Sequence, residues 1–326
     1  MLITGANGFV GASLCRYFYH KGYEIIATGR QAKSHPQLLS YATYFSADLT
    51  ESLAPFDADV CIHAAGLASD TATYKNLYLN NVIATENILA ASKHCKKVIY
   101  ISSSSVYDFS KGIAKESSAS LDAALSDYGK TKLQAEMRFQ SELPEGQKRL
   151  ILRPRAIYGI GDRVLLPRLL RMIKAGVIIC PVADHIETSA THVDNLAYAI
   201  DLFLNQPKQP AFQVLNIADD CVYKLQNLIA KTLATVEGRK LRLINISKLL
   251  PYMSGKIQLS KDLSPIALKA LSTNSVLDLT NIKKSLVYSP STTFGESCLE
   301  LGKWIKSIGG KKAYLKSLNE VPWLQQ

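Results

Sequence analysis

The feature that most constrains this chain is a glycine-rich segment at its start. Gly5, Gly8 and Gly11 recur in the run TGANGFVG, between an apolar stretch at residues 1–3 and a helical pattern at residues 10–21. In a strand–turn–helix unit, such glycines permit a tight turn, close approach of a pyrophosphate and close packing of helix on sheet. The helix start also offers free N–H groups and a positive dipole end to phosphates. We therefore predict a dinucleotide-binding turn that includes Gly5, Asn7, Gly8, Phe9, Val10 and Gly11.

Strand-like and helical patterns alternate over the first half of the chain. Helical periodicity covers residues 77–94 and 127–143, and short apolar runs occupy residues 23–28, 41–47, 58–64, 97–102 and 150–153. Short apolar strands without strict polar alternation, separated by helices, are typical of a parallel sheet covered on both faces. We therefore expect an α/β fold with a Rossmann-type, doubly wound parallel sheet. The first strand is expected either to be short or to begin upstream of Met1.

The second half of the chain has a different sequence pattern. Glycines and prolines break it into shorter pieces, with helices expected over residues 193–204, 226–236 and 295–308 and a strand over residues 212–217. This pattern predicts an NAD(P)-binding domain over residues 1–155. A smaller, mainly substrate-binding lobe is expected over residues 156–326, with the strand near 212–217 returning to the large sheet.

Composition and charge argue against several classes of partner. The formal net charge is +11, but the 38 Lys and Arg residues are spread along the chain, and the densest cluster, at residues 306–316, is expected to be a solvated face. No apolar run reaches the length of a membrane span. The six cysteines form no CxxC pair and no zinc-like spacing. We expect a cytoplasmic protein with a small-molecule substrate and no nucleic-acid, membrane or metal partner.

The end of the second expected strand bears on which dinucleotide binds. An acidic residue there favours the free ribose 2′-hydroxyl of NAD, whereas an arginine accommodates the 2′-phosphate of NADP. This strand ends in Ala27-Thr28-Gly29-Arg30 and contains no acid. We therefore expect NADP in preference to NAD, the alternative being that Arg30 merely faces solvent.

Tyr128 and Lys132 form a candidate catalytic pair. Residues spaced i and i+4 lie on one face of a helix, and a cation there lowers the tyrosine pKa from its ordinary value of about 10. The tyrosine can then exchange a proton with a carbinol oxygen while hydride moves to or from a nicotinamide. Hydroxyls at residues 103–105 follow the strand at 97–102, where ligands bind in such sheets. The alternative is an ordinary pair on a surface helix.

Taken together, these segments resemble the extended branch of the short-chain dehydrogenase/reductase superfamily, the NAD(P)-dependent epimerase/dehydratase family. The resemblance covers almost the whole chain. It rests on the TGANGFVG turn, Asp48-Leu49, residues 62–66, 80–82 and 103–107, Tyr128 with Lys132, and residues 152–154, 157–159, 192–195 and 278–290.

The resemblance implies roles for particular residues. Tyr128 would be the acid/base, Lys132 would lower its pKa and bind the nicotinamide ribose, and Ser103 would be the catalytic serine, with Ser104 as the alternative. His63 is expected to be a packed core residue, and His192 either a packed residue or a substrate contact. A homodimer is also implied. The further cofactor contacts expected are Asp48, Leu49, Ala64, Ala65, Gly66, Asn81 and Arg155.

The choice of reaction stays open at this level. Members that dehydrate sugar nucleotides carry Thr-Asp-Glu where this chain has three serines, which argues against dehydration. Ala156 stands where many sugar-nucleotide members carry asparagine, which favours a dehydrogenase or keto-reductase resembling 3β-hydroxysteroid dehydrogenases. A nucleoside-diphosphate-sugar epimerase with tightly bound NAD(P) is the alternative, and a non-catalytic nucleotide sensor the third. Arg155, Arg163 and Arg168 could bind a carboxylate or phosphate, or simply face solvent.

Overall fold

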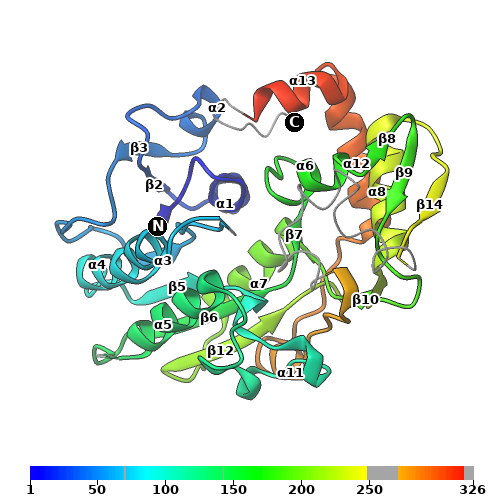
Figure 1. The fold of residues 1–326 in the computed structure, drawn as a ribbon. Helices are drawn as coiled ribbons and strands as arrows, with labels where there is room; N and C mark the ends of the chain where they lie inside the picture. Colours follow the sequence, from blue (N-terminus) through cyan, green and yellow to red (C-terminus); the bar gives the residue numbers. More distant parts are fainter. Residues whose placement is uncertain (70, 142, 248–270, 319–326) are drawn as a thin grey trace.

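A seven-stranded sheet forms the centre of the molecule (Figure 1), in a computed structural model that describes residues 1–69, 71–141, 143–247 and 271–318. The strand order is β12-β6-β5-β4-β1-β2-β3, and every pairing within the sheet is parallel. The expected Rossmann-type fold is confirmed. The strands are β1 (Leu2–Thr4), β2 (Ile26–Gly29), β3 (Thr43–Ser46), β4 (Val60–His63), β5 (Lys97–Ile101), β6 (Lys148–Pro154) and β12 (Phe212–Ile217).

Helices cover both faces of this sheet. One face carries α1 (Phe9–His20), α7 (Val193–Asn205) and α11 (Thr280–Leu286). The other carries α3 (Tyr74–Tyr78), α4 (Ala84–Ala91) and α5 (Asp127–Gln140). Successive strand residues point to opposite faces, so Ile3 and Ile62 join the first core while Leu2 and Cys61 join the second. Two apolar faces explain why these strands lack polar alternation.

The long helix expected over residues 77–94 contains an irregular turn. Between α3 and α4 the backbone forms the π-helical segment η1 (Leu79–Ile83), which carries Asn80 and Asn81. Apolar periodicity does not reveal one such turn, and π turns are frequent at functional sites. The helix expected over residues 127–143 ends as α5 at Gln140, and residue 142 lies outside the described residues.

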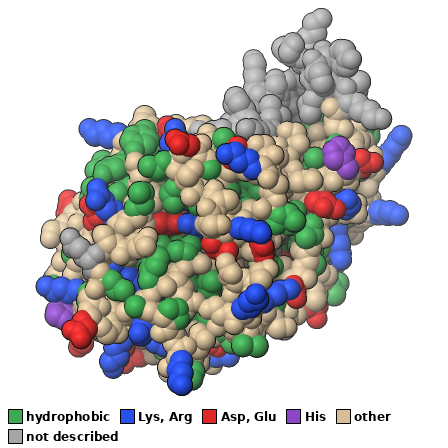
Figure 2. All heavy atoms as spheres, turned by 90° about the horizontal axis from the view of Figure 1, so that it is seen from below, with side chains coloured by type: hydrophobic (Ala, Val, Ile, Leu, Met, Phe, Trp, Pro, Cys, Tyr) green, Lys and Arg blue, Asp and Glu red, His purple; other side chains and the backbone are tan. Residues whose placement is uncertain are grey.

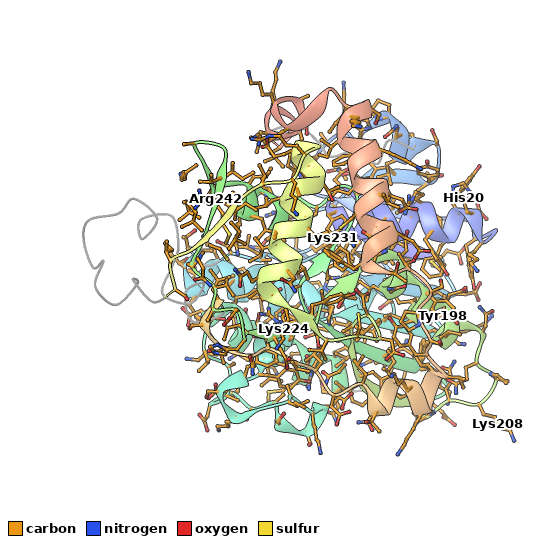
Figure 3. All side chains as sticks on the ribbon, turned by 90° about the vertical axis from the view of Figure 1, so that its right-hand side faces the viewer. His20, Tyr198, Lys208, Lys224, Lys231 and Arg242 are labelled. Carbon is orange, nitrogen blue, oxygen red and sulfur yellow. The ribbon has the colours of Figure 1, made fainter. Side chains whose placement is uncertain are left out.

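The second half of the chain builds a smaller group of elements beside the sheet. Its core joins α6 (Leu165–Leu170), α8 (Leu225–Glu237), α12 (Phe294–Ser307) and α13 (Gly310–Ser317). A sheet of β8 (Ile173–Lys174), β9 (Val177–Cys180) and β14 (Leu243–Asn245) packs on the same core. Figure 3 shows α8 and α12 side by side, with Lys231 on α8. Residues 248–270 and 319–326 of the expected lobe lie outside the described residues.

The remaining described elements are short. They are α2 (Pro36–Leu39), the pairs β7 (Ile157–Tyr158) with β11 (Thr191–His192) and β10 (Glu187–Thr188) with β13 (Tyr223–Lys224), and the 3₁₀ helices η2 (Ser104–Val106), η3 (Phe109–Lys111) and η4 (Glu116–Ser118).

The charged side chains lie mostly on the surface, and the cysteines are mostly buried. Basic and acidic side chains are interspersed over the face shown in Figure 2. In the segment 306–316, Tyr314 is buried whereas Lys306 and Lys312 are exposed, as a solvated helix face requires. All six cysteines are free thiols, and Cys221 alone among them is exposed. Among the described helices, none has the length and apolar character needed to cross a bilayer.

Candidate active site

The glycine-rich turn packs against itself and against the loop that follows β4. Gly5 has φ +68°, and a Cβ at this position would lie 2.8 Å from the Ala65 Cα. A Cβ on Gly11 would lie 2.3 Å from the Gly5 carbonyl oxygen. The absence of a side chain at Gly11 therefore lets α1 pack against the glycine turn itself. We expected Gly11 to permit a contact between the helix and the sheet. Gly8 is the N-cap of α1, so the free N–H groups of the first helical turn begin at Phe9 and Val10.

A cavity of about 410 Å³ opens at this turn. It gathers the turn with the segments that follow β2, β3 and β4, all at the carboxyl ends of the strands, where ligands of doubly wound sheets bind. Its walls include nine of the residues expected to bind the cofactor: Gly5, Asn7, Gly8, Arg30, Asp48, Leu49, Ala64, Ala65 and Gly66. They also include residues that we did not expect to bind the cofactor, among them Gln31, Thr50, Asn80 and Arg163, although Arg163 is a candidate for binding a carboxylate or phosphate.

The two polar atoms of the Asn7 side-chain amide differ in their hydrogen bonding. Its Nδ2 donates to the Gln31 Oε1 at 2.8 Å and to the Tyr44 hydroxyl at 3.0 Å. Its Oδ1 is buried and accepts no hydrogen bond from the described residues. A buried acceptor without a donor is uncommon in folded proteins. Together with the glycine cradle, which any Cβ would fill, this open acceptor fits a bound dinucleotide.

Arg30 stands at the wall of the cavity. Its Nη1 donates to the Asn80 Oδ1 at 3.1 Å, which links the end of β2 to the π turn. Asp48 accepts from the Thr50 amide at 2.9 Å and its hydroxyl at 2.8 Å. These hydrogen bonds, with a smaller contribution from Arg30, lower the pKa of the Asp48 carboxyl. The wall of the cavity thus carries the Arg30 cation, after β2, and the Asp48 carboxylate, after β3, which is already hydrogen-bonded to Thr50.

Lys132 lies buried beneath the same edge of the sheet. Its Nζ donates to the Ile101 carbonyl at 2.7 Å and lies 4.2 Å from the centroid of the Tyr100 ring. Burial lowers the lysine pKa to about 7, although the nearby Glu136 carboxylate raises it. The carbonyl and the ring face stabilise the ammonium that burial disfavours.

Asn81 connects the loop after β4 to α5. Its Oδ1 accepts from the Leu67 amide at 2.8 Å, and its Nδ2 donates to the Leu67 carbonyl at 3.2 Å and to the Thr131 hydroxyl at 3.1 Å. A Cβ on Gly66 would lie 3.0 Å from the same Oδ1, so the loop passes closely over Asn81. Asn81 therefore fixes the position of the segment that carries Ala64, Ala65 and Gly66.

Tyr128 lies in the first turn of α5, beside the serine segment. Ser126 caps the helix by accepting from the Gly129 amide at 3.0 Å. A Cβ on Gly129 would lie 2.1 Å from the Ser105 carbonyl oxygen, so α5 approaches η2 more closely than any other residue type allows. Ser103 is half-buried and its Oγ donates to the Ser105 Oγ at 3.1 Å, whereas Ser104 is buried. Of the two candidate serines, Ser103 is therefore the more accessible.

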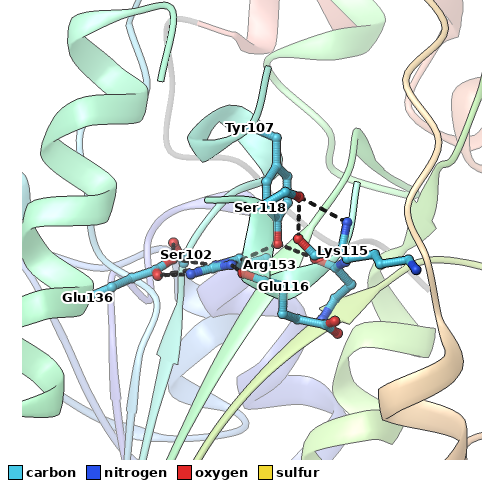
Figure 4. A network of polar contacts seen from close by, with 8 residues as sticks. Ser102, Tyr107, Lys115, Glu116, Ser118, Glu136 and Arg153 are labelled. Carbon is cyan, nitrogen blue, oxygen red and sulfur yellow. Dashed lines mark hydrogen bonds and ion pairs between the residues drawn. The ribbon is translucent and has the colours of Figure 1, made fainter. Parts of the chain in front are cut away.

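A buried ion pair holds this arrangement together (Figure 4). Arg153 at the end of β6 donates from Nη2 to the Glu136 Oε2 at 2.5 Å and from Nε to Oε1 at 3.0 Å. Glu136 also accepts from the Ser102 hydroxyl, next to Ser103. The Arg153 Nη1 donates to the Tyr107 hydroxyl at 2.8 Å. Glu136 and Arg153 are 17 residues apart, and no sequence motif indicates that they pair. The sequence shows only that Glu136 shares a helix face with Tyr128 and Lys132.

The two histidines singled out by the sequence are both buried and hydrogen-bonded within the fold. His63 is fully buried between the Thr4 hydroxyl, 2.8 Å from Nδ1, and the Thr85 hydroxyl, 3.1 Å from Nε2. Burial lowers the His63 pKa to about 3, so the ring is neutral. His192 caps α7 through its Nδ1, which accepts from the Asp194 amide at 3.3 Å, and its ring packs against Tyr158.

The three arginines of the second half of the chain occupy different places. Arg163 lines the cavity and donates to the Leu318 carbonyl. Arg155 is not among the residues that line this cavity, and its guanidinium stacks 5.5 Å from the centre of the Phe109 ring. Arg168 is on α6. The described residues contain no group of three or more His, Cys, Asp or Glu side chains placed to hold a metal ion.

A doubly wound sheet, a glycine cradle at the first strand and a polar cavity across the strand ends define a dinucleotide-binding protein of the Rossmann type. Residues 1–218 match the model of the NAD dependent epimerase/dehydratase family, and the chain belongs to that family.

Relatives within this family carry out different reactions. A 2-alkyl-3-oxoalkanoate reductase from Stenotrophomonas maltophilia is 27% identical over 61% of this chain and 63% of its own length. A 3-beta-hydroxysteroid dehydrogenase from Mycolicibacterium neoaurum is 24% identical over 92% of this chain and 89% of its own. The crystal structure of UDP-glucuronic acid 4-epimerase from Bacillus cereus with NAD covers 96% of this chain and 97% of that one, with 21% identity and a TM-score of 0.74. This structural likeness establishes the fold.

Proposed function

We propose that this protein is an NAD(P)-dependent dehydrogenase or reductase that acts on a hydroxyl or ketone carbon of a small molecule. The observation that carries the proposal is the contact between Gly129 and Ser105, which sets the start of α5 against the serine segment. Tyr128 and Ser103 are both half-buried there, and Lys132 is one helical turn further along α5.

The residues of this chain would divide the chemistry as follows. When bound, the nicotinamide supplies or accepts a hydride. The Tyr128 hydroxyl would give a proton to the substrate oxygen during reduction and take it back during oxidation. Lys132 as an ammonium would lower the pKa of that hydroxyl. Ser103 would donate a hydrogen bond to the same oxygen and orient it.

The cofactor would be held by the turn and by the strand ends. Gly5, Gly8 and the start of α1 suit the pyrophosphate, and Asn81 holds the loop that would line the nicotinamide side. We propose NADP as the preferred cofactor, because Arg30 lines the cavity and no acid ends β2. In Arg30→Ala the Michaelis constant for NADPH should rise about tenfold while that for NADH stays the same. An unchanged NADPH constant would refute this preference.

The substrate is best sought among hydroxy and oxo compounds. Ala156 offers no amide to a sugar, and one relative reduces 2-alkyl-3-oxoalkanoates. We expect the purified protein to consume NADPH with a 3-oxo acid or another ketone. Tyr128→Phe should lower kcat by roughly 10²- to 10⁴-fold without weakening cofactor binding. Full turnover in Tyr128→Phe would contradict the proposed chemistry.

Epimerisation of a nucleotide sugar is the second candidate function. It is favoured by the match over 96% of the chain to a UDP-glucuronic acid 4-epimerase. An epimerase would interconvert sugar-nucleotide epimers without net consumption of free NADPH. Interconversion together with no turnover of any ketone would therefore replace the first proposal by the second, and neither activity would favour a non-catalytic nucleotide sensor.

We also propose a homodimer formed through α3 and α5. These helices contact each other on the outer side of the sheet. Tyr74 on α3 is 42% exposed and Met137 on α5 is 56% exposed, which leaves apolar surface on both.

A further inference from the structure

Arg155 leaves the sheet at the edge where the substrate would react. It follows the last residue of β6, and the Ser102 amide donates to the Leu152 carbonyl at 2.8 Å, so the ends of β5 and β6 lie together. The backbone of Arg155 is fixed on both sides by one hydroxyl. Its N–H donates to the Thr191 Oγ1 at 3.2 Å, and its carbonyl accepts from that hydroxyl at 2.9 Å. The position of Arg155 is therefore set by the framework.

In the part of the chain that the structure describes, the guanidinium of Arg155 has an aromatic neighbour and no hydrogen-bond acceptor. It stacks over the Phe109 ring at 5.5 Å, and its Nε is buried without a hydrogen-bond partner. Across residues 1–69, 71–141, 143–247 and 271–318, no acceptor or carboxylate binds this guanidinium. A buried Nε–H group without an acceptor is costly, since the unmade hydrogen bond leaves a desolvated donor.

The other arginine near the end of β6 shows the contrast. Arg153, two residues earlier, donates to both oxygens of Glu136, to the Tyr107 hydroxyl and to the Glu116 carbonyl. Among the described residues, each nitrogen of the Arg153 guanidinium has an acceptor, whereas the guanidinium of Arg155 has none. Burial lowers the pKa of Arg155 to about 10, so it keeps its charge at neutral pH. Unpartnered groups of this kind are typical of ligand sites.

We propose that Arg155 binds an anionic group of the substrate, a carboxylate or a phosphate, next to the carbon that reacts at Ser103 and Tyr128. This inference rests on the proposed function. A planar guanidinium suits either anion, because its N–H groups match two oxygens at once. The Phe109 ring would keep the Arg155 guanidinium oriented and exclude water from one of its faces. Arg155 does not line the cavity at the glycine turn, which places it away from the pyrophosphate end of the cofactor.

The test compares acids with their uncharged esters on the protein saturated with NADPH. Binding of 3-hydroxyalkanoates of increasing chain length, of their methyl esters and of UDP-glucose is measured by calorimetry. The wild type should bind one acid at least about tenfold more tightly than its ester, the worth of one charge-assisted bond. Arg155→Met should remove that difference and leave the ester and NADPH affinities unchanged. Arg155→Lys should retain part of it, and the exposed control Arg171→Met all of it.

The outcomes separate this inference from the proposed function. If UDP-glucose alone loses affinity in Arg155→Met, the anion is a phosphate. If no acid and no nucleotide depends on Arg155, the inference is wrong, whatever the enzyme reduces. The protein could instead bind acids through Arg155 and yet transfer hydride to no ketone. That result would refute the proposed function and support the anion site.

Discussion

At the scale of single residues, the site contains two buried bases that the fold treats differently. Burial disfavours the charged form of both, so both pKa values fall. Lys132 has a carbonyl acceptor and an aromatic face that favour its ammonium, and its pKa stays near 7. His63 has two threonine hydroxyls and the face of the Tyr100 ring as neighbours but, within the described part of the chain, no carboxylate, and burial together with the nearby Lys132 charge lowers its pKa to about 3. Lys132 can therefore carry charge in a reaction near neutral pH, whereas His63 cannot.

The hydrogen bonds of His63 fix its tautomer. The Thr85 hydroxyl donates to the Asn81 carbonyl at 2.6 Å, so it accepts from the His63 Nε2–H. The Thr4 hydroxyl accepts from the Ala65 amide at 3.1 Å and donates to Nδ1. The neutral ring thus joins the loop after β4 to the π turn. Protonation would place two donors face to face at Nδ1.

The stability of the protein should therefore depend on pH through His63. The folded pKa of about 3 lies below the usual value of 6.5, so the stabilisation is complete above pH 6.5 and is lost as the pH falls towards 3. Between pH 6 and pH 4, urea unfolding of the wild type should lose roughly 1.4 kcal/mol per pH unit more than His63→Asn. The acidic residues titrate in both proteins and cancel in this difference. Equal slopes would show that His63 is not held neutral.

At the scale of elements, the glycine turn makes the strongest demand. Gly11 is the third residue of α1, and a Cβ there would overlap the Gly5 carbonyl group, which cannot move without opening the turn. Gly295 is the second residue of α12, and a Cβ there would have its closest neighbour at 3.5 Å, the end of the flexible Lys231 side chain. Two glycines near helix starts thus differ only in what surrounds them.

Alanine substitutions at these two glycines should move stability in opposite directions. Gly11→Ala should cost about 1–3 kcal/mol, the range for forced overpacking, and should weaken dinucleotide binding. Gly295→Ala should be neutral or stabilise by up to about 1 kcal/mol, because alanine favours helix. Chemical unfolding and NADPH titration of both variants would measure this. A Gly11→Ala protein as stable as the wild type would mean that the turn can adapt.

The strands and most helices could be predicted from the sequence, because apolar period and glycine position are local signals. The π turn at Asn80 could not, since it adds one residue to a helix without changing its pattern. The pairing of Glu136 with Arg153 and the arrival of Arg163 at the cavity were also hidden. Both depend on how distant segments pack. The roles of Ser103, Tyr128 and Lys132 came from spacing and resemblance, and they stay predictions until the variants are measured.

At the scale of the whole molecule, both halves of the chain build the site. The strand β12 closes the sheet beside β6, and Arg163 brings the second half of the chain to the cavity formed by the first. The outer faces of α3 and α5 are left with exposed apolar side chains, among them Met137. Scattered apolar residues are normal on a surface, so their meaning depends on whether these two helices meet a second copy.

A charge at Met137 should therefore separate the subunits. Met137→Glu would place a carboxylate in the centre of the proposed helix interface, where desolvation without a partner is costly. Light scattering coupled to size exclusion should give a dimer for the wild type and a monomer for Met137→Glu, with the helical circular dichroism unchanged. Leu299→Glu is the control, because Leu299 is 69% exposed on α12, away from α3 and α5. A monomeric wild type, or a dimer that survives Met137→Glu but not Leu299→Glu, would refute this interface.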